Sequence, residues 1–123
     1  MQAVAVAAGG AAGALLRFWM SVAVHSWLGR GFPYGTLLVN VLGSLLMGLL
    51  YVMLLERLVT GPEWRAGLLI GVLGAFTTFS TFSMETLNLV EQGAAAKAVL
   101  NIVTNVALCL LAVWLGVTAG RQL

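Results

Sequence analysis

Residues 74–85 read GAFTTFSTFSME and lie in the middle of an otherwise apolar segment, residues 64–90. They contain three threonines, two serines and three phenylalanines. Ser and Thr side chains compete for backbone hydrogen bonds, which weakens a helix. We therefore expect the helix to be interrupted between Gly74 and Thr78, with a continuous helix whose hydroxyls bond the preceding turn as the alternative. In a membrane, such a break is tolerated only where it is buried or lines a cavity.

The rest of the chain has the composition of an integral membrane protein. Of its 123 residues, 61% are hydrophobic and 8% are charged, against about 25% charged in an ordinary soluble domain. This composition excludes a soluble globular domain, a disordered tail and a nucleic-acid-binding module. The predicted fold is all-α, a single transmembrane domain of residues 1–123. Its four helices, each long enough to span a bilayer, are expected at about residues 2–28, 35–58, 64–90 and 94–120.

The basic residues are nearly balanced between the two membrane faces. Four spans put both termini and the second loop on one side, with Arg57, Arg65 and Arg121. The other side holds Arg30 and Lys97. A fixed orientation requires a clear bias in Lys and Arg. The weak bias favours a chain that inserts both ways and forms an antiparallel homodimer; a single orientation set by one charge is the alternative.

Small residues recur at the spacing that lets membrane helices approach closely. Gly9 and Gly13 form one GxxxG pair, and Gly67 and Gly71 form another. Such pairs allow backbones to pack without lipid between them. They predict helix–helix contacts and say little about function.

Polar residues within the other spans are candidates for an ion path, because polar groups are costly in lipid. Asn40 can donate two hydrogen bonds to an anion or join two helices. Arg17 either faces a water-filled vestibule, or extends its charged end to the membrane surface or pairs with Glu85. Asn101 and Asn105 share one face of the fourth span, where they either line a path or hold helices together.

The chemistry of these residues favours transport of an anion over catalysis. The sequence has no Ser/His/Asp set, no paired carboxylates and no His/Cys cluster, so we predict that it is not an enzyme. Hydroxyl and amide donors, an arginine and aromatic ring edges all attract anions. Dense donors suit a small anion whose water shell must be replaced group by group.

Three motifs resemble those of the bacterial Fluc (CrcB) fluoride channels, over the whole chain and in the same order. They are Gly9, Gly10, Gly13, Ala14 and Arg17; Gly35, Thr36, Asn40 and Gly43; and residues 74–82 with Glu85. The resemblance implies an antiparallel, dual-topology homodimer in the inner (plasma) membrane. It also implies two pores through which fluoride leaves the cytoplasm passively.

The same resemblance implies roles for individual residues. Backbone carbonyls of Gly74 and Thr77 would hold a central structural sodium ion. The fluoride pore would include Asn40, Phe79, Ser80, Thr81, Phe82 and Ser83. The vestibule and path would include Arg17, Thr36, Glu85, Asn101 and Asn105. Many relatives carry a Tyr and a Ser in the fourth helix where this chain has Asn101 and Asn105. Either amides replace those residues along the line of polar side chains beside the pore, or this chain is a specialised subunit.

Two other functions remain open at this point. A proton-coupled exporter resembling the small multidrug resistance family would also be a four-helix dimer, but it needs a membrane-buried carboxylate, and Glu85 is peripheral. A non-transporting assembly subunit would not explain the hydroxyl and Phe cluster. The expected partners are therefore fluoride, a second copy of the chain and the lipid membrane, with no nucleic acid.

Overall fold

A computed structural model describes residues 1–57 and 60–123 as helices joined by short connections. Leu58 and Val59, at the predicted end of the second segment and the start of its loop, lie outside the described residues. The elements are α1 (Gln2–Leu28), α2 (Tyr34–Tyr51), η1 (Val52–Arg57), α3 (Pro62–Arg65), η2 (Ala66–Leu73), α4 (Gly74–Phe76), α5 (Phe79–Glu91) and α6 (Ala95–Gln122).

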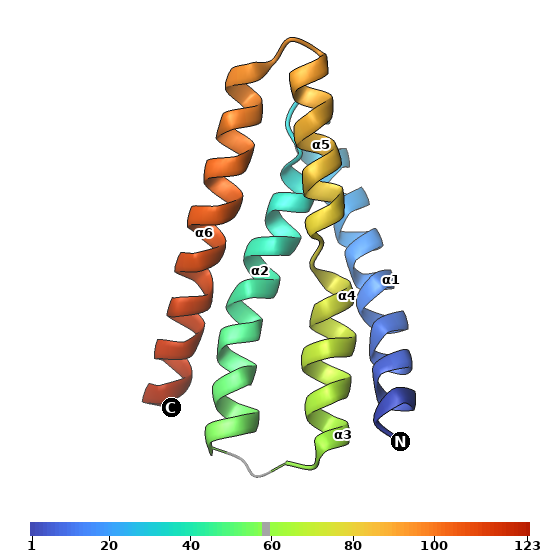
Figure 1. Ribbon diagram of the computed structural model, residues 1–123, viewed down its shortest axis with the longest axis vertical. Helices are drawn as coiled ribbons and strands as arrows, with labels where there is room; N and C mark the ends of the chain where they lie inside the picture. Colours follow the sequence, from blue (N-terminus) through green and yellow to red (C-terminus); the bar gives the residue numbers. More distant parts are fainter. Residues whose placement is uncertain (58–59) are drawn as a thin grey trace.

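In the described residues these elements combine into four apolar spans, which confirms the prediction of an all-helical chain with four long apolar helices. The spans are Gln2–Leu28, Tyr34–Arg57, Pro62–Glu91 and Ala95–Gln122. They run alternately up and down, so both termini lie at the same end of the bundle (Figure 1). Pro62 is the first residue of α3, the position where its missing N–H costs nothing.

The two GxxxG pairs meet each other where α1 packs against η2. A Cβ atom added to Gly9 would collide with the carbonyl of Gly67, and one added to Gly13 would collide with the carbonyl of Val72. A Cβ on Gly71 would lie 2.9 Å from the carbonyl oxygen of Val6. Because the obstacles are backbone atoms, only glycine allows this approach. We call this contact between α1 and η2 the glycine seam.

A second close contact joins α2 to α6. A Cβ on Gly48 would collide with the carbonyl of Val113, and one on Gly116 would collide with the carbonyl of Leu45. Further along α2, a Cβ on Gly43 would collide with the side chain of Thr77. Gly43 therefore lets α2 lie directly against the junction of α4 and α5.

Two stretches of the spans, η1 and η2, are π-helical. A π-helix bonds each N–H to the carbonyl five residues earlier, so its turns are wider than those of an α-helix. The sequence predicts helices here without this widening, because apolar periodicity does not distinguish the two bonding patterns over one or two turns.

Candidate functional site

The third span leaves helical geometry between α4 and α5, in the middle of the bundle (Figure 1). Thr77 has φ −87° and ψ 158°, and Thr78 has φ −150° and ψ 122°. Both are extended conformations that any residue adopts. The hydroxyl of Thr78 caps the start of α5 by accepting a hydrogen bond from the N–H of Thr81, at 3.2 Å.

The side-chain amide of Asn40 binds the extended backbone from α2. Its Oδ1 accepts a hydrogen bond from the N–H of Thr78 at 2.8 Å, and its Nδ2 donates one to the carbonyl of Thr78 at 3.0 Å. This pairing satisfies two backbone groups that would be costly to leave unpaired within a membrane. The Thr78 N–H also fixes which way the amide points, since only Oδ1 can accept.

These contacts release two carbonyls from their helical partners. In a continuous helix the Gly74 carbonyl would bond the N–H of Thr78, and the Thr77 carbonyl would bond the N–H of Thr81. Here the first N–H is taken by Asn40 Oδ1 and the second by Thr78 Oγ1. Gly74 and Thr77 are the two residues whose carbonyls the family resemblance implies as ligands to sodium.

The amide of Asn40 continues into a buried polar network on α6. Its Nδ2 also donates to Asn105 Oδ1 at 3.1 Å, and Asn105 Nδ2 donates to Asn101 Oδ1 at 2.9 Å and to the Asn101 carbonyl at 3.0 Å. Asn101 Nδ2 then donates to Thr86 Oγ1 at 2.9 Å, and the Thr86 hydroxyl donates to the carbonyl of Phe82 at 2.8 Å. Asn101 is 0% exposed and Asn105 is buried. We call this set of four side chains, Asn40, Asn105, Asn101 and Thr86, the amide network.

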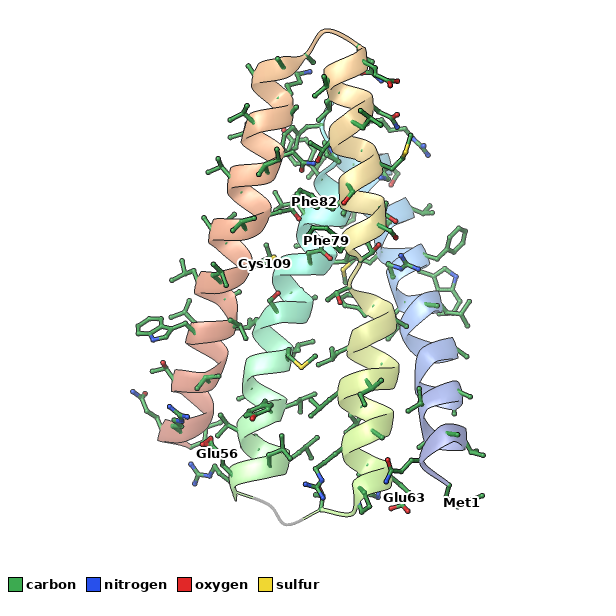
Figure 2. All side chains as sticks on the ribbon, in the orientation of Figure 1. Met1, Glu56, Glu63, Phe79, Phe82 and Cys109 are labelled. Carbon is green, nitrogen blue, oxygen red and sulfur yellow. The ribbon has the colours of Figure 1, made fainter. Side chains whose placement is uncertain are left out.

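The two phenylalanines at the start of α5 have different surroundings. Phe82 is 7% exposed, whereas Phe79 is 77% exposed in the single chain. Their ring centroids lie 5.4 Å apart with the planes tilted by 59°. Figure 2 shows both rings in the middle of the bundle, close to the level of Cys109 on α6.

Both rings also line an open pocket of about 470 Å³ between α2, α5 and α6. The polar residues at its wall include Asn40, Ser44, Thr77, Thr78 and Asn105. The remaining lining residues are mostly apolar. The pocket therefore brings the extended backbone, the Phe pair and one end of the amide network to a common space.

Of the other hydroxyls of the predicted pore, those of Ser80 and Ser83 lie on the outer side of α5 and that of Thr81 does not. Ser80 and Ser83 are exposed and Thr81 is half-buried. The Ser83 hydroxyl donates to the carbonyl of Phe79 at 2.9 Å, one turn earlier in the same helix. Ser80 and Ser83 thus form, with Phe79, a polar and aromatic stripe on the surface of the single chain.

The residues predicted for the vestibule and path are dispersed. Thr36 is buried one turn before Asn40 on α2, and Arg17 is half-exposed on α1. Glu85 is half-buried, with its Oε1 atom enclosed and without a hydrogen-bond partner. Within residues 1–57 and 60–123, Arg17 and Glu85 do not pair, because the one salt bridge there joins Arg121 to Glu56.

Sequence reasoning missed Thr86, which connects α6 to the turn that carries Phe82. A signal did exist, because Thr86 follows Thr78 and Phe82 at intervals of four residues and therefore shares a helix face with Phe82. The Asn101 amide that selects it lies 15 residues away on another helix, which no local pattern reveals.

Comparison with known proteins gives one consistent result. A family model described as "CrcB-like protein, Camphor Resistance (CrcB)" matches residues 4–117. The chain is 53% identical over 121 residues, 98% of each chain, to a protein of Magnetococcus marinus named fluoride-specific ion channel FluC. A Coxiella burnetii protein of the same name is 48% identical over 124 residues and the full length of both chains. A third, from Methylococcus capsulatus, is 57% identical over 97% of this chain, which spans about half of that longer protein (52%).

Proposed function

The chain belongs to the CrcB-like family, and from this premise we propose that it is a fluoride-selective channel through which fluoride leaves the cytoplasm passively. The observation that carries the proposal is the 53% identity, over 98% of both chains, to a relative named a fluoride-specific ion channel. The chain is a multi-pass protein of the bacterial plasma membrane. The family forms ion channels and is not a family of enzymes.

The functional unit in this proposal is an antiparallel dimer. Phe79, Ser80 and Ser83 are exposed beside a broken helix in the middle of a membrane span. Hydroxyls and irregular backbone are costly against lipid tails, so a second copy of the chain would cover this stripe. The near-equal numbers of basic residues at the two ends of the bundle support opposite orientations of the two copies. At the end that holds the termini, Arg121 is moreover paired with Glu56 at 3.2 Å.

The proposed fluoride path runs beside α5. Ring edges of Phe79 and Phe82 carry partial positive charge and can contact an anion. The hydroxyls of Ser80, Thr81 and Ser83 can replace water molecules that a small anion loses. Both donor hydrogens of Asn40 are already used, on Thr78 and Asn105. Asn40 would therefore serve the path chiefly by holding the extended backbone in place. It would also hold Asn105, which forms part of the pocket wall.

We also propose that the carbonyls of Gly74 and Thr77 hold a structural sodium ion. Their helical partners are bonded elsewhere, and hard cations prefer oxygen ligands of this kind. The residues present therefore fit the ion. Bound there, sodium would neutralise the partial negative charge of these carbonyls.

The proposed channel function is tested by reconstituting the purified protein in liposomes. Vesicles loaded with fluoride are followed with a fluoride electrode, and a matched set is loaded with chloride. We expect rapid fluoride efflux without chloride loss. Absence of fluoride efflux from folded dimer would contradict the proposal, and efflux that requires an imposed proton gradient would favour the exporter instead.

The sodium site is tested in the same liposomes by exhaustive exchange of sodium for a bulky organic cation. We expect the dimer to lose thermal stability and fluoride efflux to fall, because the freed carbonyls would then face one another without a counter-charge. Restoring sodium should restore both. Unchanged melting and efflux after complete exchange would contradict the sodium assignment and leave the channel function intact.

A further inference from the structure

Within one chain, α5 has few neighbours. Beyond the extended residues that precede it, α5 packs chiefly against α6, with a smaller contact to α2. In the described part of the chain, a single side-chain hydrogen bond joins α5 to α6, and it runs from Asn101 Nδ2 to Thr86 Oγ1 at 2.9 Å. The same Thr86 hydroxyl donates to the carbonyl of Phe82. The contact between the two helices is therefore made at the turn that carries Phe82.

The direction of every bond in the amide network is determined. The Thr78 N–H requires Asn40 Oδ1 as acceptor, so Asn40 Nδ2 faces Asn105 Oδ1. Asn105 uses its Nδ2 hydrogens on the Oδ1 and carbonyl of Asn101. Asn101 must then present its Nδ2 to Thr86. Donors therefore run head to tail from the break in the third span to the Phe82 carbonyl, an arrangement in which each bond polarises the next.

We infer that Asn101 and Thr86 are positioning residues, which fix α5 on α6 and so hold the ring of Phe82 beside that of Phe79. The inference rests on the proposed function, in which these rings border the fluoride path. Asn101 has no exposed surface, so it acts through Thr86 and does not touch the ion. The Thr86 hydroxyl bridges the two helices because it accepts from Asn101 while donating to Phe82.

The first test observes the Phe82 ring without relying on transport. A 4-fluorophenylalanine is placed at position 82 of the full-length protein, and its ¹⁹F NMR spectrum is recorded in fluoride-free detergent micelles. We expect one narrow line for the otherwise unchanged chain and a shifted or broadened line for Thr86→Val, which removes the hydroxyl and keeps the side-chain shape. Thr86→Ser, which restores a hydroxyl, should return the line to its original position.

The second test measures fluoride efflux from liposomes. We expect Thr86→Val to slow efflux about three- to twentyfold, the range that corresponds to measured interhelical hydrogen bonds in membranes. Thr86→Ser should recover most of the rate. The matched control is Thr104→Val, because the Thr104 hydroxyl bonds carbonyls of its own helix, Leu100 at 2.7 Å and Asn101 at 3.3 Å. This control should keep both the efflux rate and the ¹⁹F line.

A variant with both partners removed keeps the test decisive if Thr86→Val does not fold. Thr86→Val combined with Asn101→Leu leaves no unpaired amide at position 101, while Asn105 retains the backbone carbonyl of residue 101 as an acceptor. This double variant should show the same altered ¹⁹F line. An unchanged line and unchanged efflux in Thr86→Val or in the double variant would overturn the inference. If liposomes that contain the unmodified protein release chloride as readily as fluoride, the proposed function itself is overturned.

Discussion

The glycine seam and the amide network hold the same bundle together by opposite means. In the seam, α1 and η2 approach so closely that backbone carbonyls occupy the space a Cβ would need at Gly9 and Gly13. Among the described residues, no side-chain hydrogen bond crosses it. In the network, amides from α2 and α6 reach across to bond the third span at Thr78 and Thr86.

The two regions exclude different kinds of substitution. The seam requires that its glycines carry no side chain, so any added side-chain volume disrupts it, whether that side chain is polar or apolar. The network depends on matched donors and acceptors, so it is sensitive to lost polarity even when the volume is kept. Of the two regions, only the network bonds the extended Thr78 and the backbone of Phe82. The candidate site therefore lies where the fold depends on hydrogen bonds between side chains.

The largest effect is expected in the seam, from Gly13→Leu. Its side chain would have to displace the carbonyl of Val72, and overpacking against backbone costs about 3 kcal/mol or more. Folded protein should disappear, as measured by size-exclusion chromatography of the detergent-extracted protein. Gly10→Ala is a control for substitution of a glycine outside the seam contact, because a Cβ there meets no atom within 4 Å, and it should fold normally. Normal folding of Gly13→Leu would show that the seam tolerates volume.

A smaller effect is expected in the network, from Asn40→Leu, which keeps the volume and removes the amide. The N–H and carbonyl of Thr78 would lose their partners, which lowers the free energy of unfolding by about 2 kcal/mol for half-buried groups. Fluoride efflux should also fall sharply. Melting temperature and efflux are compared with Asn88→Leu, an exposed amide on α5. Equal behaviour of the two variants would mean that Asn40 does not hold the extended backbone.

The smallest expected difference in stability separates the two phenylalanines. Phe82→Ile alters a buried side chain and should lower the free energy of unfolding by about 1 kcal/mol, whereas Phe79→Ile alters one that is 77% exposed in the single chain and should leave protomer stability unchanged. Both should stop fluoride efflux, since both rings border the proposed path. Thermal melting and liposome efflux test the pair. Normal efflux in both variants would show that the two rings do not border the fluoride path.

Much of the fold could be predicted because it depends on composition and short-range patterns. Four apolar segments of sufficient length predict four spans, and the GxxxG pairs predict close helix contacts, although not which glycines meet. The hydroxyl-rich residues 74–85 predict where helical bonding is weakest. The extended residues Thr77 and Thr78 lie within that stretch.

The site itself depends on contacts between distant parts of the chain. Asn40 lies 38 residues from Thr78 and 65 residues from Asn105, and an amide at any of these positions could equally have bonded its own helix or a water molecule. The sequence left open whether Asn40 and Asn105 line a path or join helices. In the structure they join helices, and they also form part of the wall of the 470 Å³ pocket.

Two residues of extended backbone also divide one macrodipole into two. Aligned peptide groups leave about half a positive charge at the N-terminus of a helix and about half a negative charge at its C-terminus. An unbroken span would present these ends to water on the two faces of the membrane. In this chain the negative end at Phe76 and the positive end at Phe79 meet across Thr77 and Thr78. The break therefore offers partial charge of both signs in the middle of the span, from backbone alone and without an ionised side chain at Thr77 or Thr78.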